Sequence, residues 1–117
     1  MKTIYDPIFK TWVSAFVDQD EARAKKKIEK LLDESLEDMG FNSQAKTVEY
    51  RSSEGGQRIV MWFRKNDLSL LAHELIHVIE YSFELRRIPL GGNAEVLAYY
   101  MEYLFREFEP LFKGKKG

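Results

Sequence analysis

The apolar stretch that follows Asp67 constrains the fold of this chain more than any other feature. Its apolar residues recur every three or four positions, which is the period of a helix with one buried face. Asn66 or Asp67 can cap the start of such a helix, and the segment 89–92, with one proline and two glycines, ends it. We therefore predict a helix that runs to about Arg87. Its expected core face comprises Leu68, Leu71, Leu75, Ile79 and Phe83, extended by Ile76 and Val78.

Three other segments have the composition of strands. The first runs from Ile8 to Val17, just after Pro7, and is rich in β-branched and aromatic residues. The other two, Lys46 to Arg51 and Arg58 to Phe63, flank a polar, glycine-bearing connection at 52–57. Two short strand-like runs with such a connection predict a hairpin.

Two further segments have the pattern of helices. From Glu21 to Met39 the apolar residues follow three-four spacing, with capping groups just before it at 18–20 and Gly40 as its C-terminal glycine. The last helix is expected to begin after Asn93 and to run to about Phe108, shortly before a proline.

The order of these elements is strand, helix, hairpin, helix, helix, which predicts a small α+β domain. We expect a mainly antiparallel, three-stranded sheet packed by the helices. No repeat, linker or change in composition divides the chain. Residues 1–112 are therefore expected to form a single domain, followed by a polar, frayed tail at 113–117.

Composition excludes several classes of function. The 117 residues carry a formal net charge of −1, so no overall basic field attracts nucleic acid. No apolar run approaches the ~20 residues of a membrane helix, and the N-terminal residues lack a signal-peptide pattern. The chain contains no cysteine, which excludes disulfides and thiolate metal ligands. We expect a cytoplasmic protein that binds neither nucleic acid nor membrane, and its oligomeric state stays open.

The helix predicted after Asp67 carries the sequence His73-Glu74-Leu75-Ile76-His77. Residues four apart lie on one face of a helix, so the two imidazoles can take neighbouring positions on a tetrahedral Zn²⁺ ion. Glu74 is rotated from His73 by roughly a third of a turn. From there it can act as general base on a water at the zinc, and pass the proton to the leaving group. The alternative is two partly buried histidines that neighbouring carboxylates satisfy.

A catalytic zinc site needs a third protein ligand. The chain has no other histidine and no cysteine, so this ligand is expected to be a carboxylate. Glu95 opens the last predicted helix, after a turn that would fold this helix back onto the first, and we favour it. Glu102, two turns further along, is the alternative. The structural interpretation of Glu95 is a first-turn carboxylate that interacts with the helix dipole.

Four tyrosines near these residues in the sequence are candidates for supporting roles. Tyr99 lies four residues after Glu95, on the same helical face, where its hydroxyl can hydrogen-bond a metal ligand. Because no histidine is spare, a tyrosine hydroxyl is expected to stabilise the oxyanion that forms when water adds to a carbonyl. We place Tyr99 in the catalytic set. The four candidates for the oxyanion are Tyr81, Tyr99, Tyr100 and Tyr103, and for each a plain core aromatic is the simpler interpretation.

Residues 72–78 (AHELIHV) resemble the active-site helix of the zincin metallopeptidases. A glutamate on a following helix, with seventeen residues between His77 and Glu95, is similar to the gluzincin branch of that family. The chain is also similar in length and layout to small zincin-like proteins of phages and prophages, in which HExxH precedes a Glu-x-x-Ala-Tyr pattern, here at 95–99. This resemblance, which covers about half of the chain, implies a zincin-like fold with His73 and His77 as zinc ligands, Glu74 as general base and Glu95 as third ligand.

The same resemblance implies where a substrate binds. In zincins the strand before the one that leads into the active-site helix lies at the sheet edge and pairs with an extended peptide or protein substrate. That segment is Thr47 to Arg51 here. Two features depart from the gluzincin pattern. Tyr99 stands where gluzincins carry an acid, and the separate C-terminal domain that completes their cleft has no counterpart in this sequence.

Three functional hypotheses follow. The first is a zinc-dependent metallopeptidase that hydrolyses peptide bonds. The second is a non-catalytic, metal-stabilised interaction or regulatory protein of phage or prophage type on a zincin scaffold, and the third is a binding domain without metal. Glu74 favours the first, because a structural zinc site has no need of a base between its ligands and is usually closed by four protein ligands.

Overall fold

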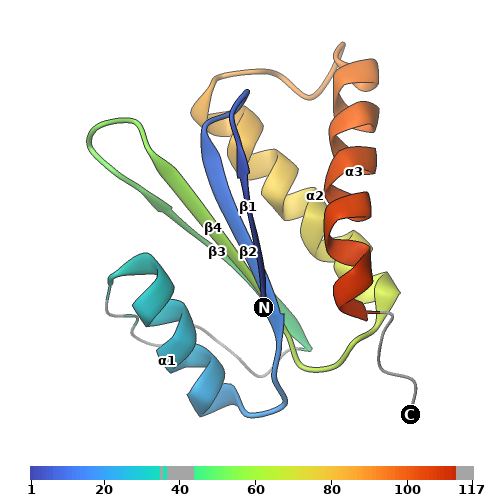
Figure 1. Cartoon of the computed structure of the whole chain (residues 1–117). Helices are drawn as coiled ribbons and strands as arrows, with labels where there is room; N and C mark the ends of the chain where they lie inside the picture. Colours follow the sequence, from blue (N-terminus) through green and yellow to red (C-terminus); the bar gives the residue numbers. More distant parts are fainter. Residues whose placement is uncertain (35, 37–43, 113–117) are drawn as a thin grey trace.

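The computed structural model describes residues 1–34, 36 and 44–112. A four-stranded sheet has α1 on one face and α2 and α3 on the other (Figure 1). The elements in chain order are β1 (Lys2–Asp6), β2 (Thr11–Val17), α1 (Glu21–Leu32), β3 (Ala45–Arg51), β4 (Gln57–Phe63), α2 (Leu68–Leu85), α3 (Ala94–Phe108) and a short 3-10 helix (Glu109–Phe112). The α+β class is therefore confirmed.

The sheet differs from the predicted one. The strand order is β1-β2-β4-β3, so the described residues form four strands rather than three. Strands β2 and β4 run parallel, whereas β1 with β2 and β3 with β4 are antiparallel. The prediction of a mainly antiparallel, three-stranded sheet is wrong, and the sheet is mixed.

Strand β1 is the one that the sequence pattern did not reveal. It is five residues long, and only Ile4 and Asp6 are buried, so it shows little of the apolar alternation of a strand. The predicted strand began too early, because residues 7–10 form the turn between β1 and β2. The Asp6 carboxylate Oδ1 accepts hydrogen bonds from the main-chain N–H groups of Ile8 at 2.9 Å and Phe9 at 3.3 Å. This local bonding favours a turn over an extended chain.

The parallel pair follows from the path of the chain. Val17 and Ala45 both lie beside Phe63, so β3 begins at the end of the sheet where β2 ends. Strand β3 then brings the chain back, and β4, which is antiparallel to β3, runs in the same direction as β2. Every residue of β4 except Arg58 is buried. Such a near-continuous apolar run is typical of a central strand that is covered on both faces. The predicted hairpin of β3 and β4 is confirmed and forms one half of this arrangement.

The side chains of β4 divide the interior into two cores. Ile59, Met61 and Phe63 pack in the core beneath α2 and α3, and Val60 and Trp62 pack in the core beneath α1. The division arises because successive side chains of a strand point to opposite faces of the sheet. The histidine-bearing helix α2 thus packs on a sheet whose opposite face is covered by α1 (Figure 1).

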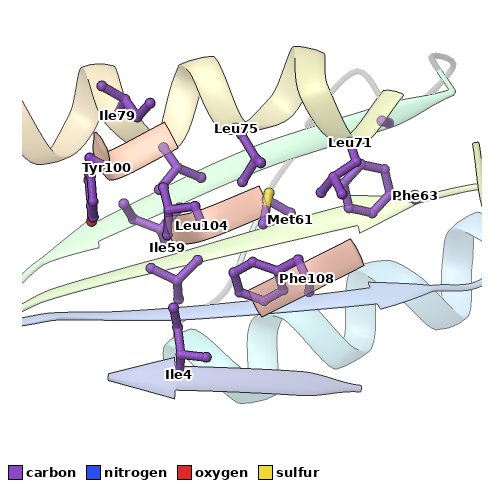
Figure 2. Packing of buried hydrophobic residues seen from close by; sticks show 14 of the residues in the cluster. Ile4, Ile59, Met61, Phe63, Leu71, Leu75, Ile79, Tyr100, Leu104 and Phe108 are labelled. Atoms are coloured by element: carbon purple, nitrogen blue, oxygen red, sulfur yellow. The ribbon is translucent and has the colours of Figure 1, made fainter. Parts of the chain in front are cut away.

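The core face of α2 is largely as predicted (Figure 2). The buried apolar residues include Leu71, Leu75, Val78, Ile79 and Phe83. Two predicted members are instead exposed, Leu68 to 40% and Ile76 to 44%. Leu68 is the first residue of the helix, and Ile76 lies between the two histidines and outside the buried face of the helix.

The helix ends show which caps the chain uses. Asp20 caps α1 and accepts a hydrogen bond from the main-chain N–H of Arg23. This helix ends at Leu32, earlier than predicted, because Asp33 adopts a left-handed conformation with φ of +56°. The predicted end at Met39 and Gly40, like the polar tail 113–117, lies outside the described residues.

The two helices on the other face begin near the predicted residues. Asp67 caps α2, and its carboxylate accepts a hydrogen bond from the main-chain N–H of Ser69. Helix α3 begins after Asn93, whose side chain makes no capping bond but donates to the carbonyl oxygen of Pro89 at 2.6 Å. The hydrogen bond from Asn93 to Pro89 therefore restrains the loop between the two helices.

Candidate metal centre

His73 and His77 lie on the face of α2 that points away from the sheet. Their side chains are 69% and 43% exposed, and their ring centroids are 5.3 Å apart with the planes inclined by 72°. This placement follows from helical geometry. One side of α2 packs in the core through Leu71, Leu75 and Val78, so residues on the opposite side face solvent. The two rings are close enough to take adjacent positions on one ion.

Glu74 occupies a different environment from the histidines that flank it. It is only 5% exposed, because one step along the helix turns it toward β3. Its carboxylate Oε1 accepts a hydrogen bond from the hydroxyl of Thr47. The other oxygen, Oε2, lies 3.9 Å from the Nε2 atom of His73. One oxygen is thus held by the sheet while the other faces the histidines.

A cavity of about 240 Å³ joins these groups. Its walls are the start of β3 (residues 45–47) and the side chains of His73, Glu74, His77 and Tyr81 from α2. The predicted substrate strand therefore lies beside the histidine pair, and β3 is one of the two edge strands of the described sheet.

Glu80 supports one of the histidines. Its Oε1 lies 3.1 Å from the Nδ1 atom of His77. When Nδ1 carries the proton, it donates to this carboxylate, and the Nε2 lone pair is left for a metal. No role for Glu80 is predicted from the sequence. Its position three residues after His77, on the same helical face, was the signal available.

The structure does not bring the predicted third ligand to the histidine pair. Glu95 lies exposed in the first turn of α3. Glu102, the alternative, is also exposed and forms an ion pair with Arg106 at 2.8 Å. Among the described residues, no three His, Cys, Asp or Glu side chains lie close enough together to hold an ion. The two imidazoles can supply two ligands to a zinc ion, and the third ligand stays a prediction.

Only one of the four candidate tyrosines lines the histidine cavity. Tyr81 lies in its wall, and burial, assisted by the charge of Glu49, raises the pKa of its hydroxyl. This hydroxyl therefore stays protonated at neutral pH and can donate a hydrogen bond. Tyr99, predicted to belong to the catalytic set, is 68% exposed and lines a separate groove with Tyr100 and Tyr103 beside the β1–β2 turn. Tyr100 is buried, with its hydroxyl 3.4 Å from that of Ser82.

No family model, curated protein or solved structure matches this chain. In the part of the chain that the structure describes, no helix combines the length and the apolar character needed to cross a membrane. Inferences about function therefore rest on the side chains of the histidine cavity.

Proposed function

We propose that the chain is a zinc-dependent metallopeptidase. The observation that carries this proposal is the environment of Glu74. A buried carboxylate with one oxygen fixed and the other directed toward a histidine is arranged as a base, whereas a carboxylate in a merely structural role would be exposed or fully paired. The substrate proposed is an extended peptide, because the cavity opens beside an edge strand.

The residues that would hold zinc are His73 and His77, through their Nε2 atoms. Zinc in such a site supplies Lewis acidity, which makes a water molecule nucleophilic near neutral pH. Glu80 would orient His77 through the contact at Nδ1. Glu95 remains the proposed third ligand and Glu102 its alternative.

Glu74 would act as the general base. Its free oxygen takes a proton from the attacking water as the new C–O bond forms, and passes a proton to the amine nitrogen as the C–N bond breaks. The hydroxyl of Tyr81, rather than that of Tyr99, would donate a hydrogen bond to the carbonyl oxygen as negative charge develops there. Tyr81 is preferred because it lines the same cavity as Glu74.

The proposed substrate strand follows Thr47–Arg51. Gln44 with Arg64 and Ser52 with Gly56 are hydrogen-bonded pairs between the two sides of the hairpin. Such pairs alternate along an antiparallel ladder, so the main-chain N–H and C=O groups of Thr47 and Glu49 point away from β4. A peptide added at this edge would pair with those groups, next to the cavity.

The metal part of the proposal is tested by zinc analysis of purified protein. We expect zinc to bind the wild-type chain, and His73→Ala or His77→Ala to weaken binding by more than about tenfold. Ile76→Ala, a change at an exposed position between the ligands, is the matched control and should keep its zinc. Comparing Glu95→Gln with Glu102→Gln decides between the two carboxylates. Equal zinc in wild type and His73→Ala would contradict the metal site.

The catalytic part is tested by Glu74→Gln on a mixed pool of peptides. Glutamine keeps the shape of the side chain but cannot take up a proton, so cleavage should fall by at least about 10²-fold while zinc stays bound. Unchanged cleavage would show that Glu74 is not the base.

A second candidate function is a metal-stabilised interaction or regulatory protein of phage or prophage type. The exposure of the histidine pair favours this candidate, as does the lack, among the described residues, of a third ligand that would complete a catalytic site. It predicts that zinc raises the melting temperature while the wild-type protein cleaves no peptide. For either function we propose a cytoplasmic setting, which the absence of cysteine fits.

A further inference from the structure

We infer that Thr47 is a positioning residue, which holds the base Glu74 from the strand that the substrate would join. This inference rests on the proposed function and adds a residue that neither the sequence motif nor the family resemblance assigns. Thr47 lies in β3, opposite Met61 of β4, and is only 7% exposed. Its side chain points to α2 and contacts Glu74 across 27 positions of sequence.

The hydroxyl of Thr47 fixes the orientation of the carboxylate. An ionised carboxylate only accepts hydrogen bonds, so the hydroxyl must donate to Oε1. With Oε1 held, Oε2 is the oxygen that faces His73, at 3.9 Å from Nε2. Because Glu74 is buried, loss of this donor would leave a polar atom unsatisfied and the carboxylate free to rotate.

The main chain of the same residue faces the outer edge of the sheet. By the alternation of hydrogen-bonded pairs described above, the N–H and C=O groups of Thr47 point away from β4. Thr47 therefore pairs with the peptide through its main chain while its side chain holds the base. A strand bound at this edge restrains the residue that sets the position of Glu74, so productive binding and orientation of the base are linked.

This arrangement predicts a specific kinetic effect. Removing the hydroxyl leaves the main chain of β3 intact, so KM should change little, whereas the misplaced base should lower kcat. Thr47→Val, which has nearly the same shape, is expected to lower kcat by about 10–100-fold with KM within about threefold of wild type. Thr47→Ser restores a hydroxyl at the same position and should recover most of the lost kcat.

Thr11→Val is the matched control. Thr11 is another buried threonine of this sheet, and its hydroxyl donates to Gln57 at 2.7 Å, yet it lines no part of the histidine cavity. It should lower stability without a selective loss of kcat. Zinc binding of Thr47→Val should equal that of wild type, because the hydroxyl contacts the base and not a metal ligand.

A second measurement needs neither metal nor activity. In the zinc-free protein, Thr47→Val should lower the melting temperature by about 4–10 °C, since it leaves the Glu74 oxygen unsatisfied. In a Glu74→Leu background, the same change should have little effect, because no carboxylate then needs a donor. Equal losses in both backgrounds would show that the contact does not form, and would overturn the inference.

The kinetic outcomes separate this inference from the proposed function. If wild type cleaves peptides and Thr47→Val keeps the same kcat, Thr47 does not position the base, and the peptidase proposal stands. If Thr47→Val and Thr47→Ser lose kcat equally, the hydroxyl is not the cause, and the inference is also overturned. If the wild-type protein with zinc bound cleaves no peptide, the proposed function fails and the inference fails with it.

Discussion

Leu75 and Ile76 are neighbours between the two histidines, yet their side chains differ in burial. Leu75 is 0% exposed and belongs to the core beneath α2, whereas Ile76 is 44% exposed. Truncation of each residue to alanine, one at a time, therefore makes a matched pair. We expect Leu75→Ala to destabilise the protein about three times as much as Ile76→Ala, because the leucine side chain is fully buried and the isoleucine side chain is only partly buried.

The magnitudes come from the surroundings of each side chain. A fully buried leucine loses its transfer free energy and leaves a cavity, about 3 kcal/mol for a site such as Leu75. Ile76 has just over half of its surface buried, so its truncation loses about 1.5 kcal/mol of stability and leaves no closed cavity. The better helix propensity of alanine recovers about 0.5 kcal/mol, which leaves a net loss of about 1 kcal/mol. For 117 residues, 1 kcal/mol corresponds to about 4 °C in melting temperature. The expected losses are thus about 12 °C and about 4 °C.

The assay is thermal unfolding followed by circular dichroism, with a chelator present. The chelator is needed because a bound metal would add its own stabilisation to the folded state. Denaturant unfolding with an unchanged m-value would show that the variants keep the same folded state. Equal losses for the two variants, or a larger loss for Ile76→Ala, would refute the assignment of α2 faces on which the histidine site depends.

Two further predictions concern other parts of the fold. The guanidinium of Arg23, which donates to both oxygens of Asp18 at 2.7 Å, lowers the pKa of Asp18 to about 2. Because the pKa of Asp18 is lower in the folded state, the stabilisation of the fold by this ion pair is complete above about pH 4 and is lost as the pH falls toward 2. In an NMR titration of Arg23→Ala, the midpoint of Asp18 should shift toward 3.8. An unshifted midpoint would contradict the pairing. Arg87 adopts a left-handed conformation with φ of +57° just after α2. Arg87→Gly should raise the melting temperature by about 2–4 °C and Arg87→Val should lower it, so a stable valine variant would argue against that conformation.

Much of the secondary structure was predictable because its signals are local. The signals that define α2 lie within one segment: the N-cap Asp67, the apolar residues that follow it, and Pro89 just after the helix ends. The hairpin of β3 and β4 was equally visible from two short runs and a glycine-bearing connection. The errors occurred where a local pattern was weak or misleading, as in β1, whose residues are mostly exposed, and in the turn that Asp6 forms.

The order of the strands could not be predicted in the same way. The run of apolar residues in β4 is compatible with a hairpin partner on one side only, and nothing in it names β2 as the second neighbour. That pairing depends on how α1 crosses the sheet, which is a property of the whole chain. The parallel pair, and with it the four-stranded mixed sheet, was therefore accessible only from the tertiary structure.

The sequence by itself determined that His73 and His77 share one helical face and that Glu74 is turned away from it, because the helical repeat fixes both relations. Only the tertiary structure decided what Glu74 meets, which is the hydroxyl of Thr47 on an edge strand. It likewise placed Tyr81 in the histidine cavity and Tyr99 in another groove. The physical reason is that a helix sets the direction of its side chains over a few residues, whereas the partner in that direction depends on how distant segments pack.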